Sequence, residues 1–204
     1  MKISLFVGDL CDAGAEALCT STNPRLSLFM GSGGSIRDRG GYQILRECEA
    51  IIEAEFRRTG RRLLPAGSAY VTTSGDLPAK IVVHCVASDA EHRSSADIIR
   101  TCVRNALYRA DAAGCRSIAM PLFATGHARF PFDRAVIVMA DALQGATTRV
   151  QHTFIVVYDP DRAADALRLI GLAIPAAVID VQRGPVRGSE APGMWSEARD
   201  RYRA

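Results

Sequence analysis

The sequence has none of the features that define a membrane, secreted or fibrous protein. No apolar run approaches the ~18 residues that a membrane-spanning helix needs, and the first residues lack the layout of a signal peptide. No internal repeat is present, and the shares of hydrophobic residues (48%) and charged residues (23%) are those of an ordinary globular chain. We therefore expect a globular protein of the cytoplasm with no membrane partner.

A strong charge of one sign is also missing. The 25 lysines and arginines exceed the 22 aspartates and glutamates by only three. A nucleic-acid surface requires a clustered basic patch rather than a slight excess of positive charge. Nucleic acid is therefore not an expected partner.

The cysteines and histidines do not form the pattern of a metal site. None of the six cysteines belongs to a C-x-x-C pair, and the four histidines do not cluster with them. Structural zinc sites usually take closely spaced cysteine and histidine ligands. We expect reduced, buried thiols, no metal and no cofactor. His84 lies in an apolar strand pattern and is expected to be a core histidine.

The 204 residues are enough for one large domain. Strand patterns occupy residues 3–7, 17–22, 67–73, 80–86, 116–120 and 153–158. Helical patterns occupy 42–59, 132–143, 161–172 and a stretch that is capped by Ser94 or Ser95 and ends at Gly114. This alternation predicts an α/β layered domain with a largely parallel sheet.

The C-terminal part of the sequence differs from the rest. We assign residues 1–174 to the domain and residues 175–204 to a C-terminal extension. The extension begins with a possible edge strand at 177–181 and continues with glycines, prolines and arginines. We expect it to be an edge strand or a surface tail. The alternative is a contact with a partner or a second copy through Trp195, and the oligomeric state is left open.

Two glycine-containing stretches follow strands and are candidates for a binding site. Residues 23–41 contain five glycines and are expected to be the most irregular part of the chain, and residues 121–131 form a second loop. Ligands of α/β sheets bind at the carboxyl ends of strands, where Asp9 also lies. Glycines let backbone N–H groups approach phosphate oxygens, and a carboxylate accepts a hydrogen bond from a base amine or a ribose hydroxyl. These features predict a protein that binds a nucleotide diphosphate.

Six segments resemble, in the same order, the motifs of macrodomains, which are ADP-ribose-binding modules. They are GDL at 8–10, ALCTSTN at 17–23, GSGGSI at 31–36, PAGSAYVT at 65–72, VVHCV at 82–86 and PLFATGHARFP at 121–131. The resemblance extends over residues 1–172. It implies a three-layer α/β/α sandwich with a mixed central sheet. It also implies binding of ADP-ribose, of an ADP-ribosylated protein or of a metabolite derived from NAD.

The resemblance also implies a set of ligand-binding residues. The set consists of Asp9, Leu10, Asn23, Gly31, Gly33, Gly34, Ser35, Ile36, Thr125, Gly126, His127, Ala128, Arg129 and Phe130. Asp9 would accept a hydrogen bond from the adenine amine, and Tyr158 would stack on the adenine. The backbone of 31–36 would hold one end of the diphosphate and the distal ribose, residues 125–129 would supply the second phosphate loop, and Phe130 would lie near the distal ribose.

Three departures from the family pattern concern catalysis. Thr20 and Gly33 stand where hydrolytic macrodomains have an asparagine and a water-orienting aspartate, and Ala128 stands where a second hydrolytic group has an aspartate. The lysine nucleophile of that second group has no match near residues 19–21. We therefore favour binding and assign no catalytic residue.

Two other functions remain open from the sequence. One is hydrolysis with an atypical active site, which would remove ADP-ribose from proteins or act on O-acetyl-ADP-ribose or ADP-ribose 1''-phosphate. The other is binding of RNA or poly(ADP-ribose) with help from the arginines of the C-terminal extension.

Overall fold

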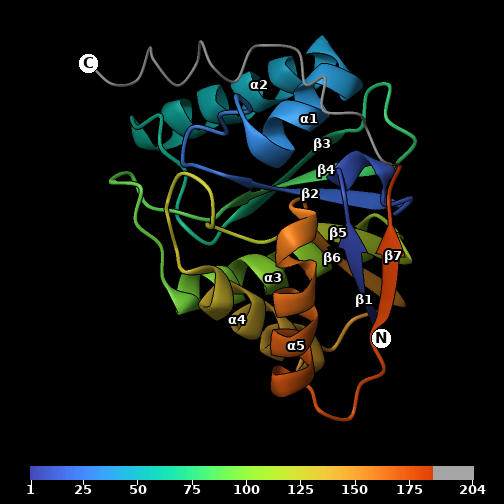
Figure 1. Ribbon diagram of the computed structural model, residues 1–204. Helices are drawn as coiled ribbons and strands as arrows, with labels where there is room; N and C mark the ends of the chain where they lie inside the picture. Colours follow the sequence, from blue (N-terminus) through green and yellow to red (C-terminus); the bar gives the residue numbers. More distant parts are fainter. Residues whose placement is uncertain (186–204) are drawn as a thin grey trace.

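A computed structural model describes residues 1–185, and these form a mixed sheet between two layers of helices (Figure 1). The strands are β1 (Lys2–Val7), β2 (Ala17–Thr22), β3 (Ala69–Thr73), β4 (Ile81–Val86), β5 (Ser117–Pro121), β6 (His152–Val157) and β7 (Asp180–Arg183). The helices are α1 (Gly31–Gly40), α2 (Tyr42–Thr59), α3 (Ala96–Ala112), α4 (Phe132–Gln144) and α5 (Ala163–Ala173), with short 3-10 turns η1 (Leu10–Asp12) and η2 (Pro160–Arg162). The expected strands and long helices are confirmed with small shifts of their ends.

The seven strands have the order β3-β4-β2-β5-β6-β1-β7. Every neighbouring pair is parallel except β3 and β4, which are antiparallel. The sheet is therefore mixed, as expected. Because six strands run the same way, the loops that follow β1, β2, β4, β5 and β6 all leave from the same end of the sheet, where the carboxyl ends of these strands lie. This end is called the strand-end edge.

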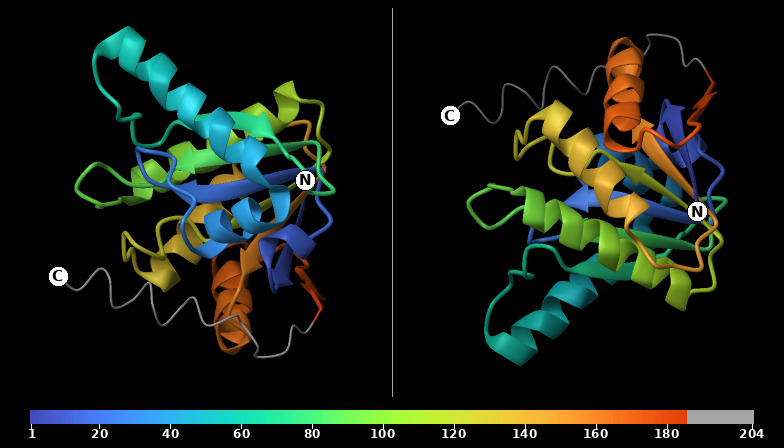
Figure 2. Two further views of the ribbon diagram at one scale, coloured as in Figure 1. Left: turned by 90° about the horizontal axis from the view of Figure 1, so that it is seen from above. Right: turned by 90° about the horizontal axis from the view of Figure 1, so that it is seen from below.

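Helices cover both faces of the sheet, which confirms the three-layer sandwich. Figure 2 shows α1 and α2 over one face and α3, α4 and α5 over the other. The strands supply one core to each layer, because alternate side chains point to opposite faces. In β2, for example, Leu18 is buried on the side of α1 and α2, and Cys19 is buried on the side of α3, α4 and α5.

The expectation that residues 23–41 are irregular is wrong for 31–40, which form helix α1. The four glycines of this segment disfavour a helix by their intrinsic propensity, but tertiary packing overrides it here. Ile36 is fully buried in the core beside α2. Gly33 and Gly34 allow the helix to lie close to the preceding loop, since a Cβ on Gly33 would lie 3.2 Å from the Cα of Leu28.

The edge strand expected at 177–181 is present at Asp180–Arg183. This strand, β7, pairs in parallel with β1, and the Gly184 N–H continues the pairing by donating to the Val7 carbonyl (2.9 Å). The extension therefore ends beside the carboxyl end of β1, where Gly8 and Asp9 follow the strand. Trp195 lies outside the described residues.

The cysteines and the helices bear on the expectations drawn from composition. All six cysteines are free and buried, so the expected burial is confirmed. Among residues 1–185, no helix has the length and apolar character needed to cross a membrane. The same residues contain no group of three or more histidine, cysteine or acidic side chains that could hold a metal ion.

Gly75 lies against the point where α1 ends and α2 begins. It lies in the turn between β3 and β4 with a φ of +55°, and a Cβ at this position would overlap the carbonyl oxygen of Gly40 at the end of α1. The adjacent Asp76 N–H donates to the same carbonyl (3.1 Å). Only glycine satisfies both the left-handed backbone and the close approach.

We expect Gly75→Ala to destabilise the fold more than Gly114→Ala does. Gly114 has a similar φ of +66°, but a Cβ there has no heavy atom within 4 Å. The control variant therefore experiences the left-handed strain, about 1–2 kcal/mol, without the overlap, which adds ~1–3 kcal/mol at Gly75. Urea denaturation of both variants measures the difference. Equal losses would contradict the close approach of Gly75 to α1.

Candidate functional site

The candidate site lies at the edge where the parallel strands end. The residues that follow β1, β2, β5 and β6 begin at Gly8, Asn23, Leu122 and Tyr158, respectively. Since β2 is hydrogen-bonded to β5 and β1 to β6, these four segments lie next to one another in pairs. The fold thus brings together the segments that the sequence singled out.

The first group of free backbone donors is the N-terminus of α1. Met30, the N-cap residue, is extended and its side chain makes no capping hydrogen bond. The first helical bond is donated by the Gly34 N–H to the Met30 carbonyl (3.1 Å). The N–H groups of Gly31, Ser32 and Gly33 therefore precede the helical ladder. Such groups, together with the helix dipole, favour an anion.

The second group of free donors is in the loop after β5. Among the described residues, the N–H groups of Thr125, Gly126, His127 and Ala128 have no hydrogen-bond partner. The loop is closed at its base, where the Phe130 N–H donates to the Ala124 carbonyl (3.0 Å). Consecutive free N–H groups in a tight loop form a concave site that suits an anion.

Two contacts fix this second loop against neighbouring segments. The Ala124 N–H donates to the hydroxyl oxygen of Ser21 in β2 (3.0 Å). The ring of His127 lies edge-on to the ring of His92, from the loop after β4, with their centroids 4.3 Å apart. Ala124 and Arg129 both have positive φ, at 64° and 50°. Sequence reasoning missed Ser21 and His92, because neither contact follows from a pattern along the chain.

An exposed tyrosine and an aspartate follow the ends of the neighbouring strands β6 and β1. Tyr158 is 75% exposed directly after β6, and Asp9 follows β1. The Gly8 N–H donates to the Val157 carbonyl (3.0 Å), which continues the β1–β6 pairing to this point. An exposed aromatic ring beside a hydrogen-bond acceptor is an arrangement that suits a purine base.

The Asp9 carboxylate is held by three donors from the protein. It caps η1 by accepting from the Cys11 N–H (2.8 Å), and it accepts from the Ser35 hydroxyl (2.6 Å) and from the Arg39 guanidinium (3.5 Å). Arg39 also donates to Asp12 (2.8 Å). Burial raises the pKa of the neighbouring Cys11 thiol to about 11, so this group stays protonated near neutral pH. The sequence did not point to Arg39.

The other residues predicted to bind the ligand have structural roles near the ends of the strands. The side chains of Leu10 and Ile36 are buried in the core. Asn23 organises its own loop, since its side-chain oxygen accepts from the backbone N–H groups of Arg25 (3.0 Å) and Ser27 (3.2 Å). Phe130 is 9% exposed and lies under the Arg134 guanidinium, 5.7 Å from the ring centroid.

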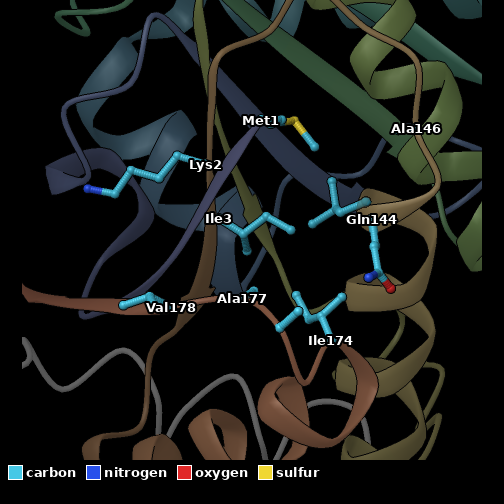
Figure 3. A pocket seen from close by; sticks show the side chains of 10 residues that line it. Met1, Lys2, Ile3, Gln144, Ala146, Ile174, Ala177 and Val178 are labelled. Atoms are coloured by element: carbon cyan, nitrogen blue, oxygen red, sulfur yellow. The ribbon is translucent and has the colours of Figure 1, made fainter.

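A separate hollow of about 370 Å³ lies at the other end of the strands, where β1 begins (Figure 3). The start of β1 and the ends of α4 and α5 line it, mainly with aliphatic side chains such as Ile3 and Ile174. Lys2 at its margin forms an ion pair with Asp180 (3.2 Å). This hollow lacks the convergent free donors of the strand-end site, and we assign no ligand to it.

Known proteins with similar sequences include macro domain proteins. The family model described as Macro domain matches residues 19–139. A macro domain-containing protein of Streptomyces nogalater is 34% identical over 160 residues, which cover 77% of this chain and 85% of the relative. The chain belongs to the macrodomain family.

Other relatives and structures extend the comparison. A protein of Pantoea vagans named O-acetyl-ADP-ribose deacetylase 1 is 31% identical over 146 residues, covering 70% of this chain and 81% of the relative. A macrodomain variant of Oceanobacillus iheyensis, solved with ADPR, superposes with a TM-score of 0.76 at 20% identity, covering 84% of this chain and 92% of the other. A Trypanosoma brucei macrodomain in complex with ADP-ribose gives 0.68 at 22% identity, covering 84% and 68%. These two likenesses show the fold.

Of the three positions that the resemblance marked as departures from hydrolytic macrodomains, Gly33 and Thr20 are enclosed. Gly33 is buried against Leu28, so an aspartate there would require the preceding loop to move. Thr20 is fully buried in β2, and its hydroxyl has no hydrogen-bond partner among the described residues.

His84, opposite Thr20 in the β2–β4 pairing, is a core histidine, as expected. It is fully buried, with Nε2 2.8 Å from the Thr72 hydroxyl and 3.8 Å from the Cys48 sulfur. Burial lowers the pKa of the His84 imidazole to about 4, although the charge of Glu47 opposes this shift. The side chain is therefore neutral in the folded protein at neutral pH.

We expect His84 to make the protein less stable as the pH falls from about 6.5 to about 4. In this range the unfolded chain binds a proton at His84 and the folded chain does not, so acid favours unfolding. Linkage gives a loss of about 2 kcal/mol between pH 7 and pH 5. Urea denaturation at both values measures it, and His84→Gln should reduce the difference by that amount. An unchanged difference in the variant would show that His84 is not the group responsible.

Proposed function

We propose that this macrodomain binds ADP-ribose, either free or attached to a protein. The observation that carries the proposal is the presence of two groups of free donors in the segments that follow the neighbouring strands β2 and β5. One consists of the N–H groups of Gly31, Ser32 and Gly33 at the start of α1, and the other of those at 125–128 in the loop after β5. Seven backbone donors on two neighbouring segments suit a ligand with two phosphates.

The base end of the site supports an adenine nucleotide. Tyr158 offers an exposed ring on which a base can stack, and Asp9 offers a carboxylate at the end of the neighbouring strand. The exocyclic amine of adenine is a donor, and a carboxylate is an acceptor only. The diphosphate would then extend from Asp9 toward the two groups of N–H donors.

The distal end supports a ligand that continues beyond the diphosphate. Gly126, His127 and Arg129 are exposed at the rim of the second loop, and Phe130 lies beneath them at its base. An ADP-ribosyl group attached to another protein could leave the site across this rim. The partner class that follows is an ADP-ribosylated protein.

The residues of the two loops favour binding of ADP-ribose over fast hydrolysis of its derivatives. The only acidic residue on 23–41 is Asp38, which is exposed and paired with Arg37 (2.7 Å), and 121–131 contain none. Hydrolysis of O-acetyl-ADP-ribose is the second candidate, because of the name of the Pantoea vagans relative. It would need a water molecule oriented by backbone groups or by the hydroxyl of Ser32.

We expect Gly126→Glu to weaken binding of ADP-ribose at least about tenfold. The carboxylate would lie among the donors of the second loop and repel the diphosphate. The fold should remain intact, since a Cβ on Gly126 has no heavy atom within 4 Å. Isothermal titration calorimetry with ADP-ribose measures the change.

Gly171→Glu is the matched control for this experiment. A Cβ there is equally unobstructed, and Gly171 is exposed near the far end of α5. It adds the same charge away from the strand-end site and should leave the affinity unchanged. Normal binding by Gly126→Glu would remove the second loop from the site, and no binding by the unmodified protein would refute the proposed function.

We expect release of ADP-ribose from modified aspartate or glutamate side chains to be slow. Losing a positioned group that handles protons or water typically costs ~10²–10⁴-fold in rate. The measurement is a time course on auto-ADP-ribosylated protein, run beside a competent macrodomain hydrolase at equal concentration, with O-acetyl-ADP-ribose as a second substrate. Comparable rates on either substrate would overturn recognition without turnover in favour of hydrolysis.

A further inference from the structure

We propose that Ser35 and Arg39 are positioning residues that orient the Asp9 carboxylate to select a base with an exocyclic amine over a base with a carbonyl at the same place. This inference rests on the proposed function, because it assumes that Asp9 faces the base. It adds to that function two side chains of α1 that touch no ligand themselves.

The geometry around Asp9 leaves little freedom to the carboxylate. The Ser35 hydroxyl lies 2.7 Å from Oδ1 and 2.6 Å from Oδ2, and the Cys11 N–H donates to Oδ1 (2.8 Å). Arg39 Nη1 approaches the same Oδ1 (3.5 Å), and its Nη2 donates to Asp12 Oδ1 (2.8 Å). The Asp9 side chain is 16% exposed and that of Arg39 is 29% exposed. The cluster is thus largely enclosed between η1 and α1.

The spacing of the two positioning residues explains why α1 can hold Asp9. Ser35 and Arg39 are four residues apart in a helix, so they lie one above the other on the same face. That face of α1 lies against η1. The same helix carries the free N–H groups of Gly31 and Ser32 at its start. The cluster therefore couples the position of the base acceptor to the position of the phosphate donors.

The remaining capacity of the carboxylate sets the base preference. A carboxylate has about four acceptor sites, and Cys11, Ser35 and Arg39 occupy three of them. One site is left for a ligand, and it suits a single N–H of an exocyclic amine. A carbonyl in the same place brings a second acceptor against the carboxylate and repels it. Loss of Ser35 or Arg39 frees the carboxylate to turn, which removes the preference.

The test compares ADP with IDP, which carries hypoxanthine, in calorimetric titrations of the full chain. The unmodified protein should bind ADP more tightly. Arg39→Met and Ser35→Ala should each reduce the ADP-to-IDP affinity ratio about three- to tenfold, through weaker binding of ADP. Arg37→Met is the matched control, since Arg37 lies on the same helix and pairs with Asp38 (2.7 Å) instead. It should leave the ratio unchanged.

A double-mutant cycle separates positioning from a general structural role. In an Asp9→Ala background, Arg39→Met should have little further effect on ADP affinity, because it acts through the missing carboxylate. Equal losses for ADP and IDP, or the same loss in both backgrounds, would overturn the inference. Ser35→Ala removes only a hydroxyl and keeps the test valid if Arg39→Met fails to fold. If the unmodified protein binds ADP-ribose but does not prefer ADP over IDP, the inference fails while the proposed function stands.

Discussion

The parallel pairing of β2 with β5 and of β1 with β6 is the constraint on which the rest of the site depends. A parallel pair ends at one edge of the sheet, so the segments that follow its strands are neighbours regardless of their separation along the chain. Asn23 and Leu122 are about a hundred positions apart, and Gly8 and Tyr158 are farther apart still, yet each pair meets at this edge. Burial of both faces of the sheet fixes the register, because a slip by one residue would expose the core side chains.

This edge concentrates backbone groups that the fold itself does not satisfy. Buried amides are normally paired, whereas the N–H groups at the start of α1 and at 125–128 remain available. Ala124 and Arg129 adopt left-handed backbone conformations that are unfavourable for residues with a Cβ. These conformations are held by the hydrogen bond that the Ala124 N–H donates to Ser21 and by the one that the Phe130 N–H donates across the loop to the Ala124 carbonyl. The donors are therefore arranged before any ligand arrives, which reduces the ordering that binding requires.

The sequence predicted those parts of the fold that have a local signal. Alternating apolar residues predicted six strands, and the residues after them, Asp9 and Tyr158, could be placed at one edge without coordinates. Helix α1 could not be predicted, because its glycines have low helix propensity and its stability comes from the burial of Ile36. The start of β7 was placed three residues too early, since a short edge strand is determined by its partner β1 more than by its own composition.

The contacts that organise the site were harder to predict, because they connect side chains on different elements. Ser35 was expected to contribute backbone, yet its hydroxyl donates to Asp9, 26 positions away. Arg39 was not singled out, since an arginine on a helix usually faces solvent. His92 approaches His127 only because β4 and β5 flank β2 and their loops meet. Periodicity along a chain predicts which face of a helix or strand is buried, but it does not predict which residues pack against that face.

The glycine at position 33 links the geometry of the site to its chemistry. With no side chain there, α1 can begin close to Leu28, and its first N–H groups are presented from the segment that follows β2. A side chain at this position would be in tight contact with Leu28, so the preceding loop would have to shift slightly to accept an aspartate. Close approach of the backbone favours recognition of phosphate, whereas hydrolysis needs space for a water molecule and a side chain that orients it. In this macrodomain the packing of one helix start against Leu28 thus presents backbone donors and leaves position 33 without a carboxylate.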